Sequence, residues 1–121
     1  MREPATTDAP WDIQVGLRNT GRRAGTEVVQ LYLRDEFARV ARPDRQLVGF
    51  TRVGLAPGES ATVRFTVDPS ALAYYDEDMR LVIEPGTMRV MVGGLEQTVT
   101  VTGAEREIAP NDRRPTVGEV I

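Results

Sequence analysis

Apolar residues recur at every second position in several short segments of the chain. Trp11, Ile13, Val15 and Leu17 alternate with polar residues and glycine, which predicts a half-buried β-strand. The segment TEVVQLYLRD at positions 26–35 carries apolar residues on both faces and is rich in β-branched and aromatic residues, which favour strands. Such a strand suits the middle of a two-layered structure, where a second sheet covers one face. We expect the other strands to be arranged around it.

Further strands are expected at short, regular spacing. Residues 46–55 (QLVGFTRVGL) are apolar but interrupted by two glycines, which predicts a bulged or bent strand. Pro57-Gly58 has the composition of a type II turn. Asp68-Pro69 predicts one helical turn at a corner, with aspartate as N-cap. The seven expected strands lie at 11–18, 26–35, 46–55, 61–67, 79–83, 88–92 and 98–102. This pattern predicts an all-β protein built as a β-sandwich.

The pattern divides the chain into three parts. Residues 1–10 are polar and contain two prolines, so we expect a flexible lead-in or linker remnant. Residues 11–103 are expected to form one domain, as the length of 121 residues allows. The alternation stops after Gly103, and the tail 104–121 is therefore expected to be loosely ordered.

Composition excludes several classes of chemistry. The chain has no cysteine and no histidine, which removes disulfides, thiol catalysis, the usual general base and the commonest metal ligand. We therefore expect no catalytic residue, no metal site and no cofactor. The net charge is −3 and the basic residues are scattered, so no nucleic-acid partner is expected. No signal-peptide core or long apolar run is present, which predicts no membrane association and a cytoplasmic chain as written.

The densest group of carboxylates is Asp76-Glu77-Asp78. Glycosidic hydrolysis needs two carboxylates on opposite sides of a cleft, which adjacent residues on one turn cannot provide. A calcium loop is also disfavoured, because Arg80 stands at a ligand position. We expect a solvated turn.

Aromatic residues offer a second candidate site. Trp11, Tyr32 and Phe65 occupy positions typical of a core, which leaves Tyr74 and Tyr75 as candidate sugar-facing aromatics. Sugar binding would require these two rings to be exposed and coplanar. Packing at a corner of the sandwich is the alternative that the pattern favours.

The loop at 36–45 mixes apolar residues with arginines, and such mixtures dominate protein interfaces. We interpret it as a candidate interdomain docking surface. In the alternative interpretation, its two apolar residues only close one end of the sandwich. The candidate docking residues are Phe37, Val40, Arg42, Pro43 and Asp44.

Several motifs occur together in an order that points to a known family. They are NTG at 19–21, VVQLYL at 28–33, GF at 49–50, LAPGES at 55–60, YD at 75–76 and EPG at 84–86. Taken in series, from about Val15 to Gly94, the sequence resembles the C-terminal fibronectin type III-like domain of glycoside hydrolase family 3 enzymes, the β-glucosidases and β-xylosidases. The resemblance implies a seven-stranded, immunoglobulin-like β-sandwich.

The resemblance also implies a role. In that family the catalytic aspartate and glutamate lie in two domains upstream of this one, so no catalytic residue is carried over to this chain. The domain is expected to pack on those catalytic domains and to meet oligo- or polysaccharide only indirectly. We expect the chain to be a fragment or split subunit of such an enzyme. The alternative is a stand-alone module that binds carbohydrate or another protein.

Overall fold

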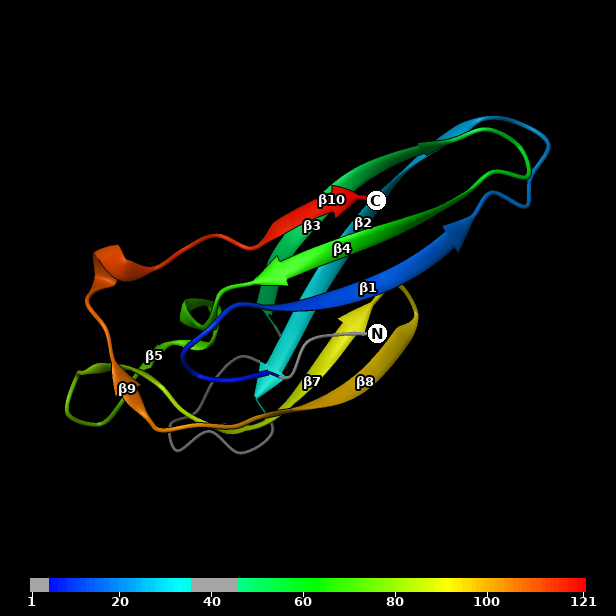
Figure 1. Cartoon of the computed structure of the whole chain (residues 1–121). Helices are drawn as coiled ribbons and strands as arrows, with labels where there is room; N and C mark the ends of the chain where they lie inside the picture. Colours follow the sequence, from blue (N-terminus) through cyan, green and yellow to red (C-terminus); the bar gives the residue numbers. More distant parts are fainter. Residues whose placement is uncertain (1–4, 36–45) are drawn as a thin grey trace.

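The computed structural model describes residues 5–35 and 46–121, and they form β-strands with two 3-10 turns (Figure 1). The prediction of an all-β sandwich is confirmed. Each of the seven expected strands is present, and three short strands, β5, β9 and β10, are added to them. The strands are β1 (Trp11–Arg18), β2 (Gly25–Asp35), β3 (Gln46–Leu55), β4 (Ser60–Val67), β5 (Tyr74–Tyr75), β6 (Leu81–Ile83), β7 (Gly86–Val92), β8 (Leu95–Val101), β9 (Arg106–Glu107) and β10 (Val117–Val120).

The strands are organised in three sheets whose neighbouring strands run antiparallel. One main sheet has the order β1-β4-β10, and the other has the order β3-β2-β7-β8. A small third sheet, β5-β6-β9, lies at one end of the molecule (Figure 1). β1 and β4 pair over eight positions, from Trp11 opposite Val67 to Arg18 opposite Ser60.

The core lies between the two main sheets and follows the alternation of the sequence. Val29, Leu31 and Leu33 of β2 are buried, as expected for the inner face of a central strand. Trp11 and Phe65 are fully buried, which agrees with their pattern positions. Further fully buried side chains come from both main sheets and from β6, namely Val63, Val67, Ile83, Val99 and Val101.

A β-bulge interrupts the pairing of β2 with β3. Leu31 lies opposite Gly49, whereas the next residue of β2, Tyr32, lies opposite Leu47, so Val48 is the extra residue. The predicted bulge in this segment is thereby confirmed. Val48 packs against the core, and Leu47 takes the same face of the sheet as Tyr32.

The predicted helical turn is also present. Residues Pro69–Leu72 form the 3-10 turn η1, and the Asp68 carboxylate accepts a hydrogen bond from the Ser70 N–H at 2.9 Å. Gly58 has φ of 76°, the left-handed backbone that a type II turn requires at its third residue. Both turns could be predicted from the sequence, because aspartate, proline and glycine each favour a particular local backbone conformation.

The tail after Gly103 is ordered, which corrects the expectation of a loose segment. β9 pairs with β6, the turn η2 spans Pro110–Asp112, and β10 pairs with β4. Gly118 of β10 permits this pairing, because a Cβ there would lie 2.8 Å from Cε1 of the buried Phe65 ring. Gly118 faces the core but has no side chain, so the alternation of apolar and polar residues that marks a strand cannot be seen in the sequence of β10.

The described part of the lead-in is anchored as well. Ala5 and Thr7 are buried, with exposed fractions of 5% and 1%. The Thr7 N–H donates to the Thr102 carbonyl at 2.9 Å, and the Thr7 hydroxyl donates to the Ala104 carbonyl at 2.7 Å. Residues 5–7 therefore belong to the folded domain, which corrects the expected boundary at residue 10.

Candidate docking surface

The outer face of the β3-β2-β7-β8 sheet carries apolar side chains that the sandwich does not cover. Phe50 is 61% exposed, Leu47 49% and Val28 42%. Tyr32 and Met91 are half-buried members of the same face. We call these five residues the outer sheet face.

Strand register places these side chains beside one another. Tyr32 lies between Leu47 on β3 and Met91 on β7, so the three form a row across the sheet. Phe50 lies opposite Gln30, whose side-chain oxygen accepts a hydrogen bond from the Tyr32 hydroxyl at 3.1 Å. The outer sheet face is therefore continuous over three strands. Its position corrects the expectation that Tyr32 belongs to the core.

Arginines border the outer sheet face. Arg34 of β2 lies opposite Arg89 of β7, and Arg52 of β3 lies opposite Val28. The Arg89 side chain lies 3.9 Å from the Glu96 carboxylate of β8. Both side chains are exposed, so this ion pair is weak. Tyrosine, phenylalanine, methionine and arginine are residue types that are enriched at protein interfaces, and all four occur on or beside this face. The face has the composition of a docking surface.

The candidate docking residues of the sequence analysis lie outside the described residues. Phe37, Val40, Arg42, Pro43 and Asp44 all fall within 36–45. That segment joins β2 to β3, the two strands that supply most of the outer sheet face. Sequence reasoning did not find this face, because the bulge at Val48 reverses the apparent alternation of β3.

Tyr74 and Tyr75 do not form a shared sugar-binding platform. They are consecutive residues of β5, and consecutive side chains of a strand point to opposite faces. Tyr74 is 7% exposed and Tyr75 45%. The condition of two exposed, coplanar rings is not met, which corrects the sugar-binding interpretation of this pair.

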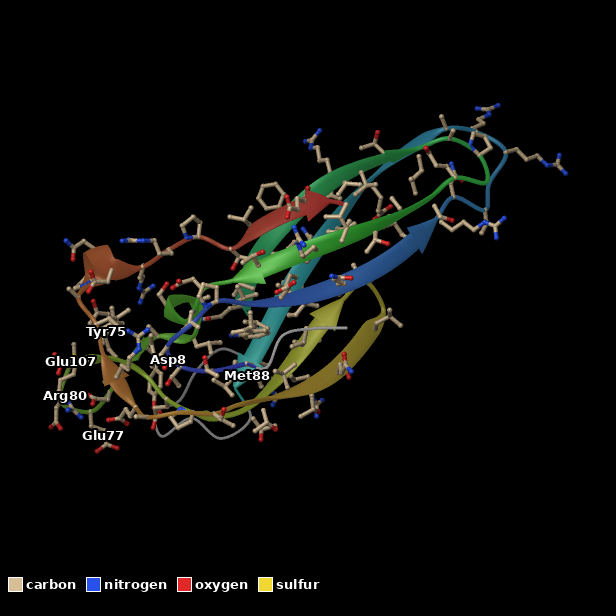
Figure 2. The ribbon with its side chains drawn as sticks, viewed as in Figure 1. Asp8, Tyr75, Glu77, Arg80, Met88 and Glu107 are labelled. Atoms are coloured by element: carbon tan, nitrogen blue, oxygen red, sulfur yellow. The ribbon has the colours of Figure 1, made fainter. Side chains whose placement is uncertain are left out.

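The carboxylate cluster closes a turn. Asp76 is buried and accepts hydrogen bonds from the N–H groups of Asp78 and Arg80, at 2.9 and 3.0 Å. The hydrogen bond from the Arg80 backbone, with further contributions from the Arg80 side chain and the Asp78 N–H, holds the pKa of Asp76 below its usual value, although burial opposes this shift. Glu77, Asp78 and Arg80 are exposed, and Glu77 and Arg80 lie with Tyr75 and Glu107 at the end of the molecule near β5 and β9 (Figure 2).

The described residues contain no group of three metal-ligating side chains close enough to hold a metal ion. Across the same residues, no helix is long and apolar enough to span a membrane.

Comparison with known proteins agrees with the motifs. The family model described as fibronectin type III-like domain matches residues 27–96. A beta-glucosidase of Bacteroides ovatus is 38% identical over 97 residues, which cover 79% of this chain and 13% of that protein. A beta-xylosidase of Formosa agariphila is 43% identical over 81 residues, covering 67% of this chain and 11% of that protein.

Solved structures give the same result. A beta-glucosidase from Listeria innocua, crystallised with gluconolactone, superposes with a TM-score of 0.78 and 33% sequence identity, over 84% of this chain and 15% of that one. A beta-glucosidase from Kluyveromyces marxianus, in complex with glucose, gives a TM-score of 0.76 and 32% identity, over 87% of this chain and 14% of that one. The chain spans about an eighth of the curated relatives that it matches.

Proposed function

From the fact that this chain belongs to the fibronectin type III-like domain family, in the form found in family 3 β-glucosidases and β-xylosidases, we propose that it is a non-catalytic accessory domain of such an enzyme. Its role is to pack on catalytic domains and to stabilise them, whether both are carried on one polypeptide or on two. The observation that carries the proposal is the match of most of the chain to a small share of much longer β-glycosidases.

The division of labour follows from the chemistry of glycoside hydrolysis. That reaction needs two carboxylates across a bound sugar. Among the described residues, the one dense carboxylate group is on a single turn, and its buried member, Asp76, is occupied by hydrogen bonds. The catalytic pair is therefore supplied by other domains, and this domain contributes rigidity.

Docking is proposed to use the outer sheet face. The exposed apolar side chains on this face are Phe50, Leu47 and Val28. Because they are held on a sheet, they can be buried only by contact with another domain, and such burial is favourable. Arg34 and Arg52 border them and suit acidic or carbonyl groups on the catalytic domains. An aromatic anchor with neighbouring arginines is the usual composition of an interface hot spot.

A chimera tests the proposal. In the Bacteroides ovatus β-glucosidase, the 97 matching residues are replaced by this chain, and a second version has those residues deleted. We expect the chimera to hydrolyse an aryl β-glucoside and to retain activity on heating for longer than the deleted version. Equal heat inactivation of the two versions would contradict a stabilising role.

Two matched substitutions locate the docking surface within the chimera. Phe50→Glu places a charge on the outer sheet face, whereas Val117→Glu places the same charge at an exposed apolar position, 55% exposed, on the other main sheet. Loss of a hot-spot residue weakens a contact by roughly 2 kcal/mol, or about thirtyfold. We expect faster heat inactivation with Phe50→Glu only. The same effect from both substitutions would place the docking contact elsewhere.

A further inference from the structure

β1 is an edge strand without a proline, a bulge or a charge on its inner face, three features that protect sheet edges against pairing. Among the residues that the structure describes, β4 is its single sheet neighbour (Figure 1). Its eight residues, WDIQVGLR, contain no proline and no lysine, and its register with β4 has no bulge. Long, regular edges of this kind are templates for strand addition.

A cavity of about 360 Å³ opens beside this edge, between β1, β2 and the β7–β8 hairpin. Val15 and Leu17 of β1 contribute to its wall, together with Val28 of β2 and Leu95 of β8. Trp11 and Ile13, on the same face of β1, are buried, whereas Val15 and Leu17 are only half-buried. The inner face of β1 thus becomes less covered toward Arg18. An added strand would continue the sheet over this cavity.

The sequence of β1 is complementary to itself in the antiparallel direction. We propose that β1 pairs with β1 of a second copy of this chain, centred on Val15, and joins two β1-β4-β10 sheets into one across a two-fold axis. Val15 then lies opposite its own equivalent, and Ile13 lies opposite Leu17 of the second copy. These apolar residues extend the inner face of the sandwich.

The same register pairs opposite charges. Asp12 lies opposite Arg18 of the second copy, and the symmetric contact repeats this pair. Neither side chain forms an ion pair with another described residue, although the charge of Asp12 also attracts Arg64 of β4. Inner faces must meet inner faces, so the register can shift only by two residues at a time. Of the registers that satisfy this condition, the one centred on Val15 brings Asp12 and Arg18 together.

Charge exchange at these two positions provides the test. Asp12→Arg sets arginine against Arg18 of the second copy, and Arg18→Asp sets aspartate against Asp12. In a dimer of either variant, two pairs of like charges therefore face each other. Cross-strand charge pairs of this kind change the dissociation constant of the dimer by roughly tenfold in total. When the two variants are mixed, both contacts become oppositely charged again.

The measurement is sedimentation velocity on the full 121-residue chain at rising concentration. We expect the unchanged chain to dimerise, each single variant to shift the dimer's dissociation constant upward by roughly tenfold or more, and the equimolar mixture to recover dimer as a heterodimer. Arg52→Asp, which borders the outer sheet face on the other main sheet, is the control and should leave dimerisation unchanged. Urea unfolding of each variant verifies that the fold is retained.

Several results would overturn the proposal. They are a monomer at all concentrations, a dimer unaffected by either single variant, and a mixture that remains monomeric. Val28, Tyr32 and Met91 of the outer sheet face also line the cavity beside β1, whereas Phe50 and Leu47 do not. Phe50→Glu therefore tests docking to catalytic domains without changing the β1 edge. A chain that dimerises but gives an inactive chimera would separate the two proposals, and so would the reverse result.

Discussion

The Asp76 carboxylate and the Arg80 guanidinium, four residues apart, close the turn between β5 and β6. Two N–H groups of Arg80 donate to one carboxylate oxygen, at 3.0 Å from Nε and 2.7 Å from Nη2. The other oxygen accepts the backbone N–H groups of Asp78 and Arg80. All four bonds favour the charged form of Asp76, so a single buried carboxylate organises the turn.

This arrangement predicts acid sensitivity. Since the pKa of Asp76 is lowered in the folded state, its contribution to the free energy of unfolding is fully present above the pKa of aspartate in the unfolded chain, about 3.9. The contribution falls as pH decreases toward the folded-state pKa. We expect Asp76→Asn to lower the urea midpoint at pH 7, and the difference from the unchanged chain to shrink below pH 4.

The control for this prediction is Asp78→Asn, which removes an exposed carboxylate from the same turn. It should lower the urea midpoint at pH 7 by less than Asp76→Asn. A difference between Asp76→Asn and the unchanged chain that stays constant from pH 7 to pH 2.5 would show that the Asp76 charge does not stabilise the turn.

Close packing of β10 gives a second prediction. A Cβ at Gly118 would meet the Phe65 ring at 2.8 Å and Cβ of Thr51 at 3.2 Å. Phe65 is fully buried and cannot move aside, so Gly118→Ala should destabilise the domain by about 1–3 kcal/mol. Urea denaturation followed by tryptophan fluorescence measures this loss, because Trp11 is buried in the same core.

Gly54→Ala is the matched control within a strand. Its Cβ would meet nothing closer than Oγ1 of Thr26 at 4.0 Å. We expect this substitution to be neutral or stabilising by roughly 0.4–1 kcal/mol, because alanine restricts the unfolded chain more than glycine does. Equal effects of the two substitutions would mean that β10 does not pack on Phe65.

Backbone strain at Met79 gives a third prediction. Met79 has φ of 61°, a left-handed conformation that is uncommon for methionine, and its side chain is 75% exposed. Asparagine tolerates this backbone, so Met79→Asn should stabilise the domain by about 1 kcal/mol and raise Tm by roughly 4 °C. Calorimetry checks the shift. Met79→Ala keeps the strain, and a comparable gain from it would rule out backbone relief as the cause.

Most of the sandwich could be predicted because its strands alternate cleanly. Trp11, Val29 and Phe65 are buried where period two places them, and Asp68 caps a turn through a local side-chain contact. Adjacent tyrosines could also have been separated by the same rule, since Tyr74 and Tyr75 must face opposite sides of a strand.

The remaining features depend on contacts between distant segments. β10 pairs with β4 through an inward glycine that looks like a turn residue in the sequence. The outer sheet face depends on a bulge whose position is set by pairing with β2, so Phe50 could not be assigned to a face from β3 alone. Thr7 is buried by contacts with residues near position 104, almost the full chain away.

The pairing of β10 with β4 also bears on how the chain folds. Val117 and Thr66 are opposite one another although they lie more than fifty positions apart, whereas β7 and β8 are joined by a tight hairpin. Closing a long loop costs entropy that local hairpins avoid, so β10 should join last. During synthesis the free side of β4 would stay open until positions 117–120 leave the ribosome. For that interval the nascent domain carries a second unpaired edge, which a chaperone or a neighbouring chain can occupy.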